Sequence, residues 1–192
     1  MSSRPIILAS SSPRRREILE SIGLDFSVVP SEFAENNNPD IPTAELVKQL
    51  ALGKAQWVAE RHPDAIVIGA DTLVSLEGII LGKPGTKEGI AESIAKLNEK
   101  THSALTGFAI VNGEQKTVDV VETKVVFRSL SDEDITAYAN TGEGIDKAGG
   151  YAIQGLGALL VDRIEGDYLN VVGLPLSRLM VRLREFGIEL LK

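Results

Sequence analysis

Short apolar runs alternate with amphipathic stretches along this chain, and this alternation limits the folds that it can adopt. A compact apolar run suits a buried strand, whereas apolar residues spaced three and four apart suit a helix that covers a sheet. The sequence therefore predicts an α/β fold. Because the chain has 192 residues, it is long enough for a single domain over residues 1–192 or for two lobes that share a core.

The order of the expected elements follows from these runs and from the Gly, Pro and Asn residues between them. Strands are expected at 5–9, 26–29, 65–70, 101–111, 117–127, 151–154, 158–164 and 168–172, with a further strand-like stretch at 73–81 that bends around Glu77-Gly78. Helices are expected at 13–23, 43–62, 86–100, 131–139 and 176–186. The strand over 65–70 is expected to stop at Asp71-Thr72, and Asn112-Gly113 is expected to join a long hairpin. Residues 32–42 read as a loop, and Ser131 with Asp134 three residues later resembles a capping box for the helix expected at 131–139.

The segment 142–150 is a candidate binding loop. It holds four glycines around Asp146-Lys147. Such a segment adopts backbone conformations that other residues avoid, or it approaches another group closely.

Composition and missing motifs exclude several kinds of site. The absence of Cys rules out disulfides and thiolate metal sites, and two separate His residues offer little to zinc, so any metal would be a hard ion bound by oxygen. There is no phosphate loop, dinucleotide glycine fingerprint, zinc-protease motif or esterase elbow. A net charge of −7 disfavours nucleic-acid binding. Since there is neither a signal peptide nor an apolar run of about 20 residues, we expect a cytoplasmic protein without membrane contact.

Three consecutive arginines, Arg14, Arg15 and Arg16, occupy the first turn of the helix expected at 13–23. Cations are unfavourable there by roughly 0.3–1 kcal/mol each, because the unpaired N–H groups of a helix start already make the potential positive. A bound phosphate would compensate for this cost, with serine hydroxyls and guanidinium groups around it. The alternative is that these arginines are solvated or pair with Glu17 and Glu20.

Other ionisable residues have two interpretations each. Asp71, at the expected end of a buried strand, points into a ligand cleft or serves as a turn residue. Lys54 on an apolar helix face, and Lys83 between Gly82 and Pro84, either face a ligand or reach into water. We interpret His62 and His102 as structural or solvent-facing.

Six short blocks in this chain together resemble the Maf family of nucleoside triphosphate pyrophosphatases. They stand in the family's order and span nearly the whole chain. The blocks are residues 6–15 (Ile-Ile-Leu-Ala-Ser-Ser-Ser-Pro-Arg-Arg), Gly69-Ala70-Asp71-Thr72, Gly82-Lys83-Pro84, Asp146-Lys147-Ala148-Gly149, Tyr151-Ala152-Ile153-Gln154-Gly155 and Asn170-Val171-Val172-Gly173-Leu174-Pro175-Leu176.

The resemblance implies an enzyme that cleaves a nucleoside triphosphate between its α- and β-phosphates with the help of a divalent cation, Mg²⁺ or Mn²⁺. It also implies the fold of inosine triphosphate pyrophosphatases, with a long twisted mixed sheet, flanking helices and two lobes around a cleft, and a homodimer. Asp71 matches the family's general base, and Glu35 matches an acidic residue near the metal, so both are expected at the cation. The phosphate-facing positions correspond to Ser10, Arg14, Arg15, Lys54 and Lys83.

The residues that separate the branches of the family correspond to Arg14, Thr72 and Gln154, and together they resemble the dTTP/UTP branch. Two positions depart from the family pattern: Gly53 stands where relatives often carry Glu, and Gly150 stands where Ala is common. Because the family is also associated with arrest of septum formation, the alternative function is a nucleotide-responsive regulator of cell division.

Overall fold

The computed structural model describes residues 4–36, 38 and 40–191, and these residues form a mixed sheet flanked by helices. The sheet has seven strands in the order β2-β1-β3-β5-β6-β7, and β4 pairs with β3. The strands are β1 (Ile6–Leu8), β2 (Ser27–Val28), β3 (Ile66–Leu76), β4 (Ile79–Leu81), β5 (Thr101–Asn112), β6 (Gln115–Phe127) and β7 (Val161–Glu165). The α/β class predicted from the sequence is confirmed.

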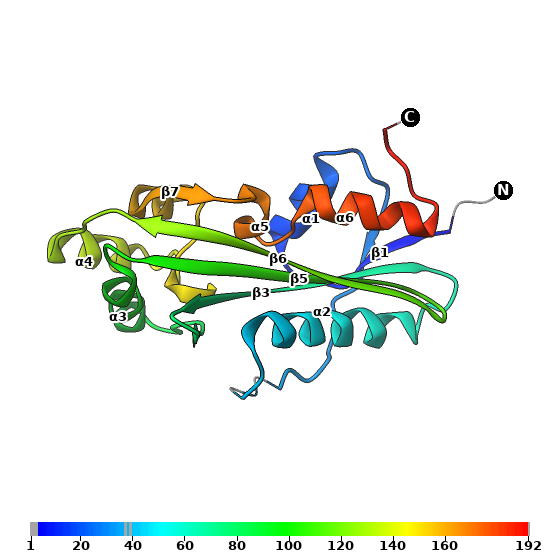
Figure 1. The fold of residues 1–192 in the computed structure, drawn as a ribbon, viewed down its shortest axis with the longest axis horizontal. Helices are drawn as coiled ribbons and strands as arrows, with labels where there is room; N and C mark the ends of the chain where they lie inside the picture. Colours follow the sequence, from blue (N-terminus) through cyan, green and yellow to red (C-terminus); the bar gives the residue numbers. More distant parts are fainter. Residues whose placement is uncertain (1–3, 37, 39, 192) are drawn as a thin grey trace. The chain divides into compact units, whose positions relative to one another are not determined.

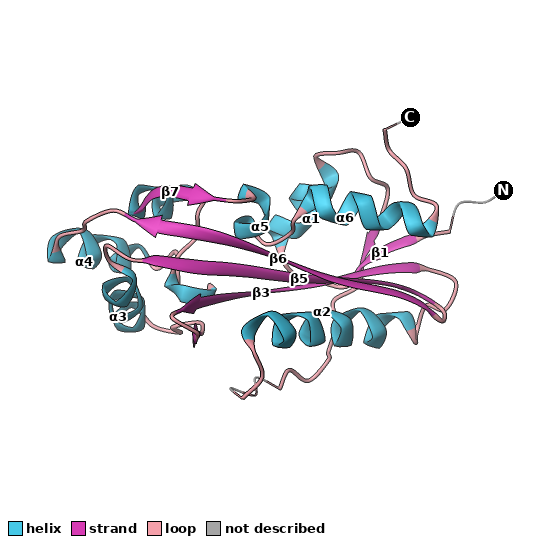
Figure 2. Cartoon of the chain, viewed as in Figure 1, coloured by secondary structure: helices cyan, strands magenta, loops and turns pink. Residues whose placement is uncertain are grey.

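The chain divides into two compact units. The first unit comprises Met1–Asp71, Thr106–Val121 and Gly173–Lys192, and the second comprises Thr72–Leu105 and Glu122–Val172. The longest strands are β3, β5 and β6, which are drawn as long arrows in Figure 2. They contain 11, 12 and 13 residues and contribute residues to both units. None of the helices in the described residues is long and apolar enough to cross a membrane.

The first unit is a layer of strands with helices on both faces. Helix α2 (Thr43–Ala59) lies along one face, and α1 (Pro13–Glu20) and α6 (Leu176–Leu183) lie on the other, followed by the short 3-10 helix η3 (Arg184–Phe186) (Figure 1). Strand β1 pairs in parallel with both β2 and β3. The buried face of α2 consists of six apolar residues that sequence periodicity places together: Leu46, Val47, Leu50, Ala51, Ala55 and Val58.

Two glycines allow α2 to approach the strands. A Cβ on Gly69 of β3 would lie 2.5 Å from the carbonyl oxygen of Ala51, and one on Gly107 of β5 would lie 2.5 Å from that of Val47. Real side chains do not tolerate such distances, so any larger residue at either position would force the helix away. The backbone of α2 therefore rests directly on β3 and β5.

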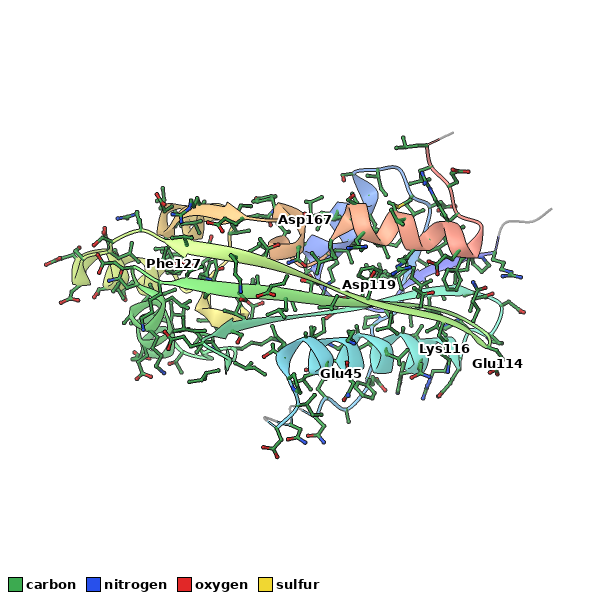
Figure 3. The ribbon with its side chains drawn as sticks, in the orientation of Figure 1. Glu45, Glu114, Lys116, Asp119, Phe127 and Asp167 are labelled. Atoms are coloured by element: carbon green, nitrogen blue, oxygen red, sulfur yellow. The ribbon has the colours of Figure 1, made fainter. Side chains whose placement is uncertain are left out.

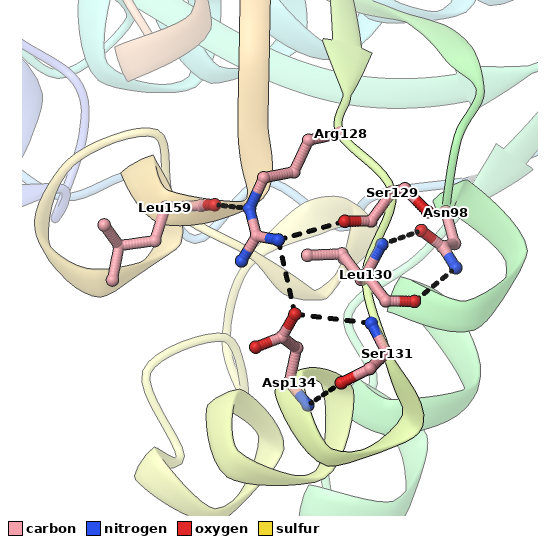
Figure 4. A network of polar contacts seen from close by, with 7 residues as sticks. All are labelled: Asn98, Arg128, Ser129, Leu130, Ser131, Asp134 and Leu159. Carbon is pink, nitrogen blue, oxygen red and sulfur yellow. Dashed lines mark hydrogen bonds and ion pairs between the residues drawn. The ribbon is translucent and has the colours of Figure 1, made fainter.

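The second unit packs α3 (Lys87–Leu97) against α4 (Asp132–Thr141). The other elements of this unit are the 3-10 helices η1 (Ala148–Gly150) and η2 (Gly155–Leu160), strand β7 and the short helix α5 (Tyr168–Val172). Ser131 caps α4 by accepting a hydrogen bond from the Asp134 N–H, and the Asp134 carboxylate accepts one from the Ser131 N–H (Figure 4). This reciprocal capping box is the one predicted from the sequence.

Several sequence predictions about strands are wrong. Strand β3 does not stop at Asp71-Thr72 but continues to Leu76, where a tight turn leads into β4. The segment 168–172, expected to be a strand, is α5, because the Asp167 carboxylate accepts hydrogen bonds from the N–H groups of Leu169 and Asn170 and starts a helix there. Residues 151–154 are likewise not a strand, and 155–160 form η2, so that β7 covers only Val161–Glu165.

An aromatic cluster in the second unit encloses the buried His102. Its ring meets Phe127 (labelled in Figure 3) and Tyr151 edge to face, at centroid distances of 5.0 and 5.4 Å. The Nε2 atom lies 2.8 Å from the Tyr151 hydroxyl, whereas Nδ1 is buried without a hydrogen-bond partner in the described part of the chain. Burial lowers the pKa of His102 from 6.5 to about 4 and raises the pKa of Tyr151.

This burial predicts a loss of stability in acid. The unfolded chain binds a proton at His102 below pH 6.5, but the folded chain does so only near pH 4, so the free energy of unfolding falls as the pH drops through this window. The shift corresponds to about 3 kcal/mol. Denaturant unfolding between pH 4 and 7 would measure it: His102→Gln should flatten the dependence, and His62→Gln should leave it unchanged. An equally steep dependence in His102→Gln would contradict the assignment.

Candidate active site

Arg15 is held at two points in the first unit. Its Nε donates to the carbonyl oxygen of Gly173 (2.8 Å), and its Nη1 donates to Oγ of Ser10 (3.2 Å). Ser10 is buried and also accepts a hydrogen bond from the N–H of Ser12. Burial lowers the pKa of Arg15, and the charges of Asp71 and Glu35 act in the opposite direction.

The three arginines of α1 have different surroundings. Arg16 forms an exposed ion pair with Glu20 (2.7 Å), which is the pairing with a neighbouring carboxylate considered as the alternative for this run. Arg14 is half-buried and makes no hydrogen bond or ion pair with another residue in the described ranges. The run therefore consists of one anchored guanidinium, one paired with a surface carboxylate, and one without a partner among the residues described.

Lys54 joins two carboxylates. Its Nζ lies 2.5 Å from Oδ1 of Asp71 and 2.8 Å from Oε1 of Glu35. The Lys54 and Asp71 side chains are 15% and 13% exposed, so this ion pair is mostly removed from water. Lys54 does not simply extend into solvent, as one of the two sequence interpretations held.

The position of Asp71 depends on the packing of α2. Asp71 lies within β3, two residues after Gly69, and Lys54 lies on the helix that Gly69 allows to approach. A buried strand tolerates a carboxylate at this point because the ammonium of Lys54 compensates its charge. Five of the predicted residues thus meet in the first unit: Ser10, Arg15, Glu35, Lys54 and Asp71.

Gly53, one of the two departures from the family pattern, has a clear structural role. A Cβ on Gly53 would lie 2.4 Å from Cζ of Phe33, whose ring packs over this glycine. Phe33 belongs to the segment that carries Glu35. The contact therefore helps to hold this segment against α2, next to Lys54.

This contact predicts a coupling between positions 53 and 33. Glycine inside a helix is normally less stable than alanine by roughly 0.5–1 kcal/mol, so Gly53→Ala should stabilise the Phe33→Ala variant. In the presence of Phe33 the new methyl group displaces the ring, and this gain should be cancelled or reversed. Denaturant unfolding of both single variants and the double variant would measure the coupling, and equal effects of Gly53→Ala in the two backgrounds would contradict it.

The remaining predicted residues, Thr72, Lys83 and Gln154, belong to the second unit. Thr72 is half-buried in β3, directly after Asp71. Lys83 and Gln154 are exposed, and neither side chain makes a hydrogen bond or ion pair within the described residues. Both side chains can therefore contact a ligand without first losing a protein partner.

The glycine-rich segment 142–150 supports the loop that carries Lys83. The N–H of Gly149 donates to the Gly82 carbonyl (3.1 Å), and the N–H of Gly85 donates to the Ile145 carbonyl (3.1 Å). Gly149 has a φ of 72°, a conformation that favours glycine, as predicted for this segment. Segment 142–150 therefore supports the loop that carries Lys83 through backbone hydrogen bonds.

Comparison with known proteins identifies the family. A family model described as Maf-like protein matches residues 5–186. This chain belongs to the Maf family. Among curated Maf relatives, the dTTP/UTP pyrophosphatase of Moorella thermoacetica is 48% identical over 186 residues, covering 96% of each chain. The dTTP/UTP pyrophosphatase of Bacillus anthracis is 48% identical over 187 residues, covering 97% of each chain. A solved structure, that of the Staphylococcus aureus Ham1 protein, aligns with a TM-score of 0.46 at 15% identity and covers 64% of this Maf chain and 71% of its own.

Sequence reasoning missed two contributors to the site of this Maf protein. The Gly173 carbonyl, which holds Arg15, lies 158 residues further along the chain, so no local pattern connects the two. The ring of Phe33 over Gly53 was also missed, although the small residue next to Lys54 was a signal that something packs there.

Proposed function

We propose that this chain hydrolyses dTTP and UTP to the nucleoside monophosphate and pyrophosphate. The observation that carries the proposal is the cluster in which Lys54 bridges Asp71 and Glu35 near the anchored Arg15. It occurs in a chain 48% identical to dTTP/UTP pyrophosphatases over nearly its full length. A buried carboxylate beside cations is the combination that phosphoryl chemistry requires.

The triphosphate needs more positive charge than the cluster supplies. The formal charges of Arg15, Lys54, Asp71 and Glu35 cancel, so we assign phosphate binding also to Arg14 and Lys83. The Arg14 guanidinium, which makes no ion pair with a described residue, can donate two hydrogen bonds to one phosphate. Ser10, which orients Arg15, completes the phosphate-binding set.

The donor set fits a divalent cation that is shared with the substrate. No group of three or more His, Asp or Glu side chains suited to a metal occurs among the residues described. The carboxylates of Glu35 and Asp71 both contact the ammonium group of Lys54. Mg²⁺ is commonly held by one or two carboxylates together with phosphate oxygens. We propose that these two residues hold Mg²⁺ or Mn²⁺, which would neutralise charge on the phosphate oxygens.

Asp71 acts as the general base in this proposal. Its carboxylate accepts a proton from water as the water oxygen bonds to phosphorus and the P–O bond to the pyrophosphate leaving group breaks. Lys54 positions the carboxylate through the 2.5 Å contact, and the positive groups stabilise the charge that develops on the phosphate oxygens.

We assign recognition of the base to Gln154, with Thr72 beside the general base as a second specificity position. An amide offers both a donor and an acceptor, which matches the imide edge of uracil or thymine, whereas an ionised Glu could only accept. Each mismatched polar group would cost about 1–3 kcal/mol.

A nucleotide panel tests this function. We expect kcat/KM to be highest for dTTP and UTP in a comparison with CTP, GTP and 7-methyl-GTP, and Gln154→Glu should reduce this preference. The assignment of the base to Gln154 is wrong if 7-methyl-GTP is the best substrate, or if the ranking does not change in the variant.

The proposal includes a cytoplasmic location and a homodimer. Light scattering during size-exclusion chromatography would give the mass of the particle in solution, which should be twice the chain mass of 20.6 kDa.

A further inference from the structure

The backbone around Gln154 is fixed, although its side chain is exposed. Two residues before it, the N–H of Ala152 donates to the hydroxyl oxygen of Tyr138 on α4 (3.3 Å). The Gln154 side chain makes no hydrogen bond or ion pair with another described residue. Its side chain is thus presented from a backbone that is held in place on the N-terminal side.

Glu143 holds the same segment on the C-terminal side. Its Oε1 accepts a hydrogen bond from the N–H of Leu156 (3.0 Å), and its Oε2 accepts one from the N–H of Gly157 (2.8 Å). These N–H groups belong to the first turn of η2, and the N–H of Leu156 precedes the first i→i+3 hydrogen bond of this 3-10 helix, so it needs a partner from outside the helix. A carboxylate that accepts two such bonds interacts more strongly than a neutral acceptor.

Gly155 makes this close contact possible. It has a φ of +67°, and a Cβ at this position would lie 2.2 Å from Oε1 of Glu143. Any other residue there would displace the carboxylate from η2. The glycine that follows Gln154 therefore leaves the space that the Glu143 carboxylate occupies.

The far end of η2 is held as well. Nε of Arg128 donates to the Leu159 carbonyl oxygen (2.5 Å), while its Nη1 lies 3.2 Å from Oδ2 of Asp134 (Figure 4). Since the C-terminal end is anchored by Arg128, loss of the Glu143 contacts would free mainly the N-terminal end, which adjoins Gln154.

We infer that Glu143 is a positioning residue for base recognition, which orients Gln154 by binding the first turn of η2. This role rests on the proposed function, in which Gln154 contacts the pyrimidine. Glu143 belongs to the second unit and Asp71 to the first, and no hydrogen bond or ion pair in the described chain joins them. Loss of Glu143 should therefore weaken selection of the base and leave the rate of the chemical step largely unchanged.

The test compares Glu143→Gln with Glu133→Gln, an exposed control on α4. In Glu143→Gln, the new amide has only one acceptor oxygen for two N–H groups. We expect KM for dTTP to rise about 10-fold, kcat to stay within about twofold, and the ratio of kcat/KM for dTTP to that for GTP to fall about 10-fold. The control should match the parent protein. Gly155→Ala, which displaces the same carboxylate, should reproduce the loss of selectivity independently.

A Gln154→Ala background separates the two proposals. If Glu143 acts through Gln154, Glu143→Gln should cause no further loss of selectivity when Gln154 is already absent. If Gln154→Ala itself leaves the dTTP-to-GTP ratio unchanged, base recognition by Gln154 fails and the positioning role fails with it. If Gln154→Ala lowers the ratio but Glu143→Gln and Gly155→Ala do not, or if the Glu143 effect persists in full without Gln154, the positioning role alone is wrong.

Discussion

Replacing Asp71 by Asn should lower kcat at least about 100-fold and leave the folded structure and nucleotide binding largely intact. Asn has nearly the same shape, and its amide oxygen can still accept the hydrogen bond from Lys54, but it cannot take up a proton from water. Steady-state kinetics with pyrophosphate detection would give kcat, and binding of a non-hydrolysable dTTP analogue would be measured separately.

Asp119→Asn is the matched control for this variant. Asp119 lies on β6 (Figure 3) in the same unit and is also paired with a cation, since Arg182 Nε is 3.0 Å from its Oδ2. The control should keep the parent kcat. If kcat of Asp71→Asn is close to the parent value, Asp71 does not act as the general base.

Arg14→Ala and Arg15→Ala should each weaken triphosphate binding by about 1–3 kcal/mol, which is roughly 5- to 150-fold in Kd. Their effects on stability should differ. Removal of Arg15 takes its donor away from the Gly173 carbonyl and leaves Ser10 Oγ with the Ser12 N–H alone, so it should also lower the free energy of unfolding. Arg14 has no partner in the described protein, so its removal should not.

Arg16→Ala serves as the control, because Arg16 pairs with the surface carboxylate of Glu20 and with no other described side chain. Titration calorimetry with the dTTP analogue and denaturant unfolding would separate affinity from stability. If affinity is the same in the Arg14, Arg15 and Arg16 variants, the arginine run is a solvated helix face rather than a phosphate site.

The sequence pattern predicts the structure correctly in those segments whose structure is determined by residues close together in the chain. The apolar spacing of α2 and the Ser131-Asp134 capping box are local, and both are confirmed. The hairpin of β5 and β6 is also confirmed, with its turn at Gly113, where φ is +58°. The sequence pattern predicts the wrong end for β3, because a contact between distant residues determines that end. Strand β3 continues through Asp71 because Lys54, on α2, compensates the charge of the Asp71 carboxylate.

The candidate site was predictable in its residue types and in its resemblance to the Maf family, but not in its contacts. The charge of the arginine run suggested an anion, yet only the folded chain distinguishes Arg15, held by Gly173, from Arg16, paired with Glu20. The link between Lys54 and its two carboxylates depends on how closely α2 packs on β3, which is set by the glycines at the contact.

The most direct test of the proposed reaction is the identity of its products. The purified chain would be incubated with dTTP and Mg²⁺ in water enriched in ¹⁸O, and the products would be separated and analysed by mass spectrometry. Cleavage between the α- and β-phosphates predicts dTMP and pyrophosphate in equal amounts, at a rate that falls at least about 100-fold in Asp71→Asn. The position of the ¹⁸O label would show which phosphorus the water attacks. Release of dTDP and inorganic phosphate, or no turnover of dTTP or UTP, would contradict the account.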